Sequence, residues 1–435
     1  MKKILFFAFV ICLLPLGGCL KDDCTSHQTF VRLDPIYKTA VAIRAEFAIG
    51  SPSELRNPGK IYVFEKYLLI NEINEGIHIF DNSNPANPIN LSFITISGNR
   101  DMAVKESVLY ADNAIDLLAI DIKDVAAPKL LKRINNVFNK SFGWNSSADA
   151  NSQPILVGYN ETTQTQVLDC SQDGFGQGSF IDRNGGIWRN LAFDAVSSQG
   201  SGGVAPASSG KASIGVGGSQ SRFGIVDPYL YAIDQTDLHV IYIDDPKNPK
   251  EGKSVQVAWN VETLFPYKDK LFIGAQSGMY IMDNKNPEAP TLLSTFSHAQ
   301  ACDPVYVDDE VAYITLRDGT KCQTFDNELD IVDIKNITAP RLIKKYPMQN
   351  PHGLSIVDKL LFICEGKYGF KIFDKSNINT IDKNLISHLT SFHAYDVIAL
   401  NAKLLLVVGE DGLMQLDASD PKSVKTISVI PVIKN

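Results

Sequence analysis

The chain has 435 residues and a formal net charge of −8, with 49 acidic against 41 basic side chains. An acidic protein of this balance is a poor partner for nucleic acid, because binding to phosphates needs a clustered basic face. Length alone suggests two or three domains. Beyond the N-terminal leader, no apolar stretch reaches the roughly 18 residues that a membrane-spanning helix needs.

The N-terminus is typical of a secretory leader. Met1–Lys3 is short and basic, and Ile4–Leu14 is an apolar run too short to span a bilayer. The next residues, Leu16-Gly17-Gly18-Cys19, resemble the bacterial lipoprotein box. This resemblance implies cleavage before Cys19 and acylation of that cysteine, for example with palmitate. We therefore expect a signal peptide over 1–18 and a lipid anchor in the outer membrane; secretion with cleavage nearby is the alternative.

A short charged segment follows the predicted anchor. Lys21 and two acidic residues, Asp22 and Asp23, come directly after Cys19 and Leu20. This pattern resembles the surface-export signal of Bacteroidetes lipoproteins, which implies exposure on the cell surface. An ordinary solvated tether explains the same residues, and both interpretations stay open. We assign residues 19–57 to the tether.

One short unit then recurs along the chain: an alternating apolar strand ends in Asp, and a turn containing Pro follows, as in Gly76–Pro88. The terminal aspartates of the copies are Asp81, Asp121, Asp244, Asp283, Asp333, Asp374 and Asp417. Asp81 and Asp121 are 40 residues apart, and Asp333 and Asp374 are 41 apart. Periods near 40 with several strands per unit are typical of propeller blades.

Each period contains four short strand patterns. The second copy shows them as Met102–Lys105, Val108–Ala111, Asp116–Ile120 and Lys129–Ile134. Four strands per unit favour a propeller blade over a solenoid coil. The terminal Asp has a local explanation, because its carboxylate can accept backbone N–H bonds in the turn. Calcium binding by the same run is the less favoured alternative.

The repeat also resembles a known family. Units such as Gly278–Asp283, followed by Asn286-Pro287 and Pro290, are similar to the LVIVD repeats of bacterial surface proteins. The resemblance extends from about Ile61 to the end of the chain, and it implies a β-propeller without implying an activity.

The sequence therefore predicts an all-β protein with a propeller over residues 58–435. The 123 positions between Asp121 and Asp244 exceed one period, and one degenerate blade fits there, with Ile155–Tyr159 and Thr165–Asp169 as strands. That gives eight blades; without it there are seven. The Gly/Ser-rich stretch at about 171–221 is expected to be an excursion, with Gly215–Gly218 as a flexible connector.

The two ends of the chain are expected to meet. A strand pattern near Thr39–Ala48 and another at Val424–Val432 flank the repeats. Because a terminal strand often closes a propeller ring, we expect both to pair in one blade.

Aligning the second strands and stepping back eight positions gives the residue at the start of each blade. The polar residues found there are Arg100, Glu262, Asp303, His352 and Asp396, with Gly59 and Ser221 at the other two starts. Since first strands line the channel of a propeller, these side chains are expected to ring one mouth of it. A solvated rim is the simpler interpretation; the functional one is a ligand site of convergent carboxylates, one Arg and one His.

We expect no cofactor. Glu262, Asp303, His352 and Asp396 could supply ligands to a channel-bound metal ion, but no spacing requires one.

Five cysteines remain after the predicted leader and anchor. In an oxidising compartment some should pair, and Cys302 and Cys322 are the best candidates, because both are expected on one face of the same blade. Cys364 lies in an apolar strand and is expected to be a buried thiol. Trp144, Trp188 and Trp259 are expected to be packing residues rather than sugar-stacking platforms.

Two functions remain open. No catalytic motif occurs, so the first is a surface lipoprotein, expected to be a monomer, whose propeller binds a protein or glycan partner. The second is an envelope polysaccharide hydrolase or lyase, with paired carboxylates at the channel mouth.

Overall fold

The computed structural model describes residues 25–138, 153–169, 180–181, 187–190, 214–219, 221–297, 304–317 and 327–433. These residues are almost entirely β-strand and turn. They divide into two compact units: residues 1–34 with 160–194, and residues 35–159 with 195–435. No helix among the described residues is long and apolar enough to cross a membrane.

One sheet lies outside the blades. Its order is β11, β1, β13, β12, with bounds Ile155–Asp169, Thr25–Lys38, Ile187–Asn190 and Phe180–Ile181. β1 and β13 pair antiparallel, with Phe30 opposite Asn190. The predicted strands Ile155–Tyr159 and Thr165–Asp169 are parts of the single strand β11 in this sheet. They do not form a degenerate blade.

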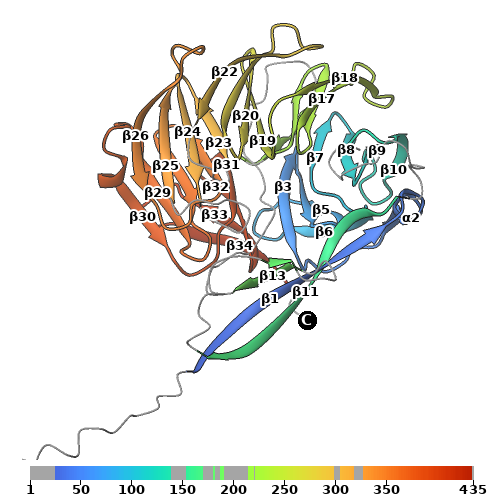
Figure 1. The fold of residues 1–435 in the computed structure, drawn as a ribbon, viewed down its shortest axis with the longest axis horizontal. Helices are drawn as coiled ribbons and strands as arrows, with labels where there is room; N and C mark the ends of the chain where they lie inside the picture. The colour runs from blue at the N-terminus through green and yellow to red at the C-terminus, as the bar shows by residue number, and fades with distance from the viewer. Residues whose placement is uncertain are drawn as a thin grey trace, which may run out of the picture. The chain divides into compact units, whose positions relative to one another are not determined.

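The larger unit contains seven four-stranded antiparallel blades among the described residues (Figure 1). The predicted β-propeller is confirmed, with the alternative count of seven blades in place of eight.

Blades one and two are β3–β6 (Pro58–Phe64, Tyr67–Glu72, Gly76–Asp81, Ile89–Thr95) and β7–β10 (Met102–Lys105, Val108–Asn113, Asp116–Asp121, Lys129–Ile134). Blades three and four are β15–β18 (Phe223–Val226, Tyr229–Ile233, Asp237–Tyr242, Lys250–Gln256) and β19–β22 (Val261–Tyr267, Lys270–Ala275, Gly278–Asp283, Thr291–Ser297). Blade five is β23–β26 (Val305–Asp308, Val311–Leu316, Glu328–Asp333, Arg341–Pro347). Blade six is β27–β30 (Leu354–Val357, Leu360–Cys364, Phe370–Asp374, Leu385–Leu389), with the 3-10 turn η3 (Ile381–Lys383) before its last strand. Blade seven is β31–β34 (Asp396–Asn401, Leu404–Gly409, Gly412–Asp417, Lys425–Pro431).

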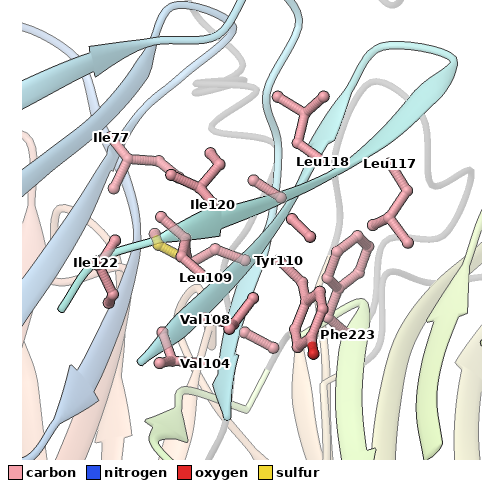
Figure 2. Close-up of a cluster of buried hydrophobic side chains, with 14 of the residues drawn as sticks. Ile77, Val104, Val108, Leu109, Tyr110, Leu117, Leu118, Ile120, Ile122 and Phe223 are labelled. Carbon is pink, nitrogen blue, oxygen red and sulfur yellow. The ribbon is translucent and has the colours of Figure 1, made fainter. Parts of the chain in front are cut away.

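Stacked blades bury both faces of their middle strands. Every residue of β8 is buried, whereas the outer strand β10 is exposed or half-buried. Figure 2 shows the blade-two core, with Ile77 of blade one and Phe223 of blade three at its two sides. Burial of one such apolar side chain contributes about 1.5–3 kcal/mol, so the stacking of blades supplies most of the favourable free energy. Cys364 is a buried free thiol in this packing, as expected.

The ring closes between blades one and seven by side-chain packing. Ile61, Leu68 and Ile70 of blade one share an apolar cluster with Ile398 and Leu406 of blade seven. The expected sharing of one blade by the two ends of the chain is not found. Thr39–Ala48 contains a short helix, α2 (Ala40–Ala45), and the next strand, β2 (Ala48–Gly50), pairs with β6 of blade one. β34 pairs with β33 of blade seven.

The turn after each third strand has the predicted chemistry. Oδ1 of Asp81 accepts the backbone N–H of Ser83 at 2.8 Å, and the same bond recurs at Asp121, Asp283, Asp333, Asp374 and Asp417. Blade three differs, because the equivalent last residue of β17 is Tyr242. Asp244 lies two residues further on, so the sequence alignment of that copy was out of register.

The same turn joins neighbouring blades. The acceptor is a backbone carbonyl in this turn, four residues after the last residue of the third strand. At six of the seven interfaces it accepts a hydrogen bond from a hydroxyl group of the preceding blade. The donor and acceptor pairs are Ser92 and Val125, Tyr110 and Pro246, Tyr231 and Pro287, Ser294 and Ile337, Tyr346 and Ile378, and Ser428 and Pro85. The last pair closes the ring, so blade seven meets blade one through the contact used elsewhere.

The outer strands share a further device. In all seven blades the third and fourth strands have a register shift at the same place, for example between Ile281 and Met282. A bulge of this kind twists the exposed edge strand and opposes edge-to-edge aggregation.

A segment of the Gly/Ser-rich stretch crosses the inner edges of the blades. β14 (Val216–Gly217) pairs with β3 of blade one, and the N–H of Gly215 donates to the carbonyl of Val104 in blade two at 3.1 Å. Oγ of Ser219 accepts the N–H of Leu354 in blade six, and the carbonyl of Ser221 accepts the N–H of Leu264 in blade four. Since first strands line the channel, residues 214–219 and Ser221 lie along it, half-buried over 214–217 and buried from Gly218 to Ser219. The expected flexible connector is an ordered inner strand.

We expect acid to weaken the propeller through its turn aspartates. The hydroxyl and N–H of Ser376 lower the pKa of Asp374, and Ser419 lowers the pKa of Asp417 in the same way. A carboxyl group whose pKa is lower in the folded state stabilises the fold at pH values above its unfolded-state pKa of about 4. This contribution to the free energy of unfolding is lost as the pH falls through the folded-state pKa. The double variant D374N/D417N should lose less stability than wild type between about pH 4 and pH 2. Urea unfolding at pH values across this range measures the free energy of unfolding, with E251Q on the exposed strand β18 as the control. If this free energy fell equally steeply with pH in the double variant and in wild type, the role given to the turn aspartates would be contradicted.

We expect Gly215→Ala to disturb the channel segment. A Cβ at Gly215 would lie 2.2 Å from Cε1 of Tyr62 and 2.6 Å from the carbonyl oxygen of Val63. Overpacking of this kind costs about 1–3 kcal/mol. Urea unfolding should show that loss, and limited proteolysis should cut the 214–221 segment faster. Gly50→Ala is the matched control, since its Cβ would meet only the carbonyl of Phe93 at 3.6 Å. Equal effects of both variants would argue against tight seating of the segment.

Candidate functional site

The start of each first strand and the hairpin between the second and third strands lie on one face, called here the leading face. In the hairpin of blade one, the N–H of Asn74 donates to the carbonyl of Asn99, in the segment that leads into blade two, at 3.0 Å. The hairpin of blade six bonds similarly to the start of blade seven, where the N–H of Gly366 donates to the carbonyl of Ala394 at 2.9 Å.

Buried carboxylates fix the start of several blades on this face. Asp112 accepts the backbone N–H groups of Arg100 and Asp101, both at 2.8 Å. Glu365 accepts two successive N–H groups in the same way, from Gln349 and Asn350. Glu72 does so in blade one, from Arg56 and Asn57. Two charge-assisted bonds per carboxylate hold each leading segment in place.

Basic side chains on the third strands pair with these carboxylates. Nε2 of His78 lies 3.0 Å from Glu72, and Nζ of Lys371 lies 2.6 Å from Glu365. In blade three, Asp234 meets Nε2 of His239 at 3.1 Å. Burial opposes ionisation of Asp234, but the bonds from His239 and from the backbone outweigh it and lower its pKa to about 2. These groups are structural pairs with little capacity left for a ligand.

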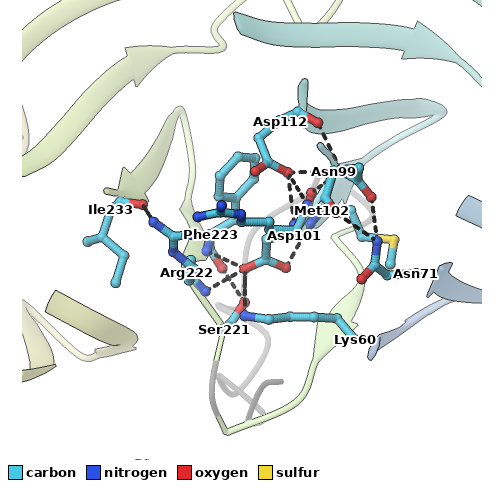
Figure 3. Close-up of polar contacts among 11 residues, drawn as sticks. Lys60, Asn71, Asn99, Asp101, Met102, Asp112, Ser221, Arg222, Phe223 and Ile233 are labelled. Atoms are coloured by element: carbon cyan, nitrogen blue, oxygen red, sulfur yellow. Dashed lines mark hydrogen bonds and ion pairs between the residues drawn. The ribbon is translucent and has the colours of Figure 1, made fainter. Parts of the chain in front are cut away.

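Asp101 joins three blades at the channel (Figure 3). Its Oδ2 accepts the N–H groups of Arg222 and Phe223, which begin blade three, and the hydroxyl of Ser221 at 3.3 Å. Nζ of Lys60, on the innermost strand of blade one, lies 3.4 Å away. Burial lowers the pKa of Lys60, and Asp101 opposes that shift. Lys60 and Asp101 are both almost fully buried, and their opposite charges compensate each other.

The structure places the five predicted ring residues in different surroundings. His352 and Asp396 lie together: Gly353, which follows His352, packs so closely on Asp396 that an added Cβ would lie 2.1 Å from Oδ1. Arg100 lines a separate hollow between blades two and three. Glu262 is half-buried in β19, and Asp303 lies outside the described residues. Of the five residues, the structure brings together only His352 and Asp396 among those that it describes, and the predicted ring stays a prediction.

Burial disfavours the charged forms of both His352 and Asp396. Burial raises the pKa of Asp396 well above its usual value, although the N–H of Val397 and the charge of Lys60 act against it. Burial, together with the charges of Arg317 and His393, lowers the pKa of His352 well below its usual value. The His352 ring packs on Tyr395, with centroids 5.3 Å apart. Within the described residues, no three His, Cys, Asp or Glu side chains lie close enough to hold a metal ion.

Two further predictions meet the structure on this face. Trp259, expected to pack, is 70% exposed just before β19, so that prediction is wrong. Cys302 and Cys322 lie outside the described residues, as do Cys19 and Trp144, and their predicted roles stay predictions.

Comparison with known proteins identifies the repeat. The family model described as "LVIVD repeat" matches residues 56–95 and 324–347, which correspond to blade one and to the third and fourth strands of blade five. The chain is a β-propeller that contains LVIVD repeats. A search of curated proteins finds no match to this LVIVD-repeat protein.

Solved structures resemble it in fold alone. The computationally designed Ika8 protein has 9% identity and a TM-score of 0.50, covering 88% of this chain and 92% of its own. Sqt1 of Saccharomyces cerevisiae has 8% identity and a TM-score of 0.49, covering 87% and 86%. BamB from Moraxella catarrhalis has 6% identity and a TM-score of 0.47, covering 90% and 97%. At such identities the likeness says nothing about activity.

We expect Asp101→Asn to destabilise the LVIVD propeller strongly. The change removes the carboxylate 3.4 Å from buried Lys60 and weakens the bonds that begin blade three, and breaking a buried pair costs about 3–5 kcal/mol. Asp308→Asn is the matched control, because it removes a carboxylate from an ion pair with Lys375 that is partly exposed and contributes about 0–1 kcal/mol. Urea unfolding measures both. Similar losses in the two variants would show that Asp101 does not join the blades as described.

Proposed function

We propose that this LVIVD-repeat protein is a lipid-anchored binding module whose leading face takes a protein or glycan partner. The observation that carries the proposal is that residues 214–219 bond to the innermost strands of blades one, two and six. Because this segment narrows the central space, a ligand would meet the leading face of the propeller.

The carboxylates of the leading face favour binding over hydrolysis. A glycosidase needs two carboxyl groups with access to the sugar. Glu72, Asp112 and Glu365 instead accept pairs of backbone N–H groups, and Asp396 is fully buried against Gly353. The alternative of a polysaccharide hydrolase or lyase gains no support from these side chains.

Trp259 supplies a contact of the kind that binding faces use. A large aromatic side chain at 70% exposure can stack on a sugar or anchor a protein partner. It stands before β19 next to Asn260, whose φ of 51° is in the left-handed region.

The anchor completes the proposal. Cys19 would carry the acyl chains, residues 20–24 would lead to the first described strand, and the protein would act as a monomer at the outer membrane, on its outward or inward leaflet. Several acyl chains give a lasting anchor, since each buried methylene contributes about 0.8 kcal/mol.

Binding and turnover are separated by one experiment. The purified protein is screened against a panel of glycans and envelope proteins, with binding and product scored separately. For a bound partner, Trp259→Ala should weaken affinity by about 30-fold or more, as expected for an aromatic anchor. Leu292→Ala, at an exposed apolar position on the outer strand β22, is the control and should change little. Product formation, or equal affinity of wild type and Trp259→Ala, would contradict the proposal.

A further inference from the structure

The loop that carries Trp259 is bonded to the hairpins of two blades. It joins β18 of blade three to β19 of blade four. The N–H of Val257 donates to the carbonyl of Thr236, in the hairpin of blade three, at 2.9 Å. In the hairpin of blade four, the N–H of Gln276 donates to the carbonyl of Asn260 at 3.1 Å. The backbone on both sides of Trp259 is therefore fixed to the leading face.

The side chain of Trp259 stays in solvent although its loop is held in place. At 70% it has the largest exposed fraction among the large apolar residues that the structure describes. Covering an aromatic side chain of this class removes about 150–250 Å² from water. A ligand that covers the indole gains that free energy without having to order the loop, because the loop is already bonded to both hairpins.

The polar side chains that this loop and the two hairpins leave exposed or half-buried are all uncharged. They are Gln235, Thr236, Asn260, Gln276 and Ser277. The carboxylates of the blade-three hairpin, Asp234 and Asp237, are 1% and 2% exposed. Glu262, the second residue of β19, is half-buried and already takes part in an interaction within the chain. The loop and the hairpins therefore present amides and hydroxyls to a ligand, and no charge.

These amides and hydroxyls suit the hydroxyl groups of a sugar. Nδ2 of Asn260 donates to Oε1 of Gln276 at 2.8 Å. A primary amide has two N–H donors and an oxygen that accepts, so this bond leaves Asn260 with donor and acceptor capacity. In the same hairpin, the hydroxyls of Ser277 and Tyr280 are 2.9 Å apart. Each sugar hydroxyl both donates and accepts, which is what such groups require of a partner.

We propose that Trp259 is the platform of a subsite for one ring of an uncharged glycan, with the amides of Asn260 and Gln276 bound to hydroxyl groups at the edge of that ring. The inference rests on the function proposed above and names its class of ligand, a neutral oligosaccharide or polysaccharide. The apolar C–H face of the sugar covers the indole, as aromatic side chains in ligand sites do, and the few polar groups beside it fix the orientation.

Neutral oligosaccharides test the subsite directly. Cellohexaose, xylohexaose, mannohexaose and chitohexaose are titrated into the full-length protein by calorimetry, with hexagalacturonate as the acidic comparison. We expect saturable binding of at least one neutral hexasaccharide, tighter than that of hexagalacturonate. The affinity should not fall at high salt, because no pair of charges takes part. Binding of none of the neutral hexasaccharides, or tighter binding of hexagalacturonate, overturns the proposal.

Variants assign the binding to the indole. Trp259→Tyr keeps a ring that can stack and should retain most of the affinity, whereas Trp259→Leu keeps only an apolar side chain and should lose about tenfold or more. Asn260→Gly keeps the left-handed backbone and removes the amide, so it should also weaken binding. Tyr37→Leu, at a position that is 57% exposed, is the matched control and should bind as wild type does. Equal affinity of wild type and Trp259→Leu overturns the subsite.

The outcomes separate this inference from the function on which it rests. A protein partner whose affinity depends on Trp259, with no neutral glycan bound, overturns the glycan subsite and leaves the proposed binding function standing. A neutral glycan that is bound through Trp259 and then cleaved supports the subsite and contradicts a function in binding alone.

Discussion

The contact between one blade and the next is the interaction on which this structure depends. A blade has two apolar faces and cannot bury either of them alone, so each is stable only between neighbours. The turn after the third strand adds a directional bond to this packing, since its carbonyl accepts a hydroxyl from the preceding blade. Ser428 and Pro85 repeat that bond between the last blade and the first at 2.6 Å. Closure therefore needs no strand shared by the two ends of the chain, because the seventh interface is built like the others.

The channel segment determines where chemistry can occur. Glycines at 215 and 217 let its backbone lie against the ring of Tyr62, closer than a side chain would allow. Through Ser219 and Ser221 the segment then bonds to blades six and four. Backbone of this segment therefore lies in the axial space, and buried carboxylates at the starts of the blades are parts of the fold. Trp259 stays exposed on the leading face.

The sequence predicts what is local and repeated, and fails where partners are distant. The Asp turns were predictable because donor and acceptor are two residues apart. The count of blades was not, because Ile155–Tyr159 alternates like a blade strand while its sheet partner β1 begins at Thr25. Stepping back eight positions from each second strand identified Arg100 and Ser221. It missed Asp101 and Arg222, which are the next residues in the chain. No periodic signal marks these two, since their importance comes from the meeting of blades one, two and three.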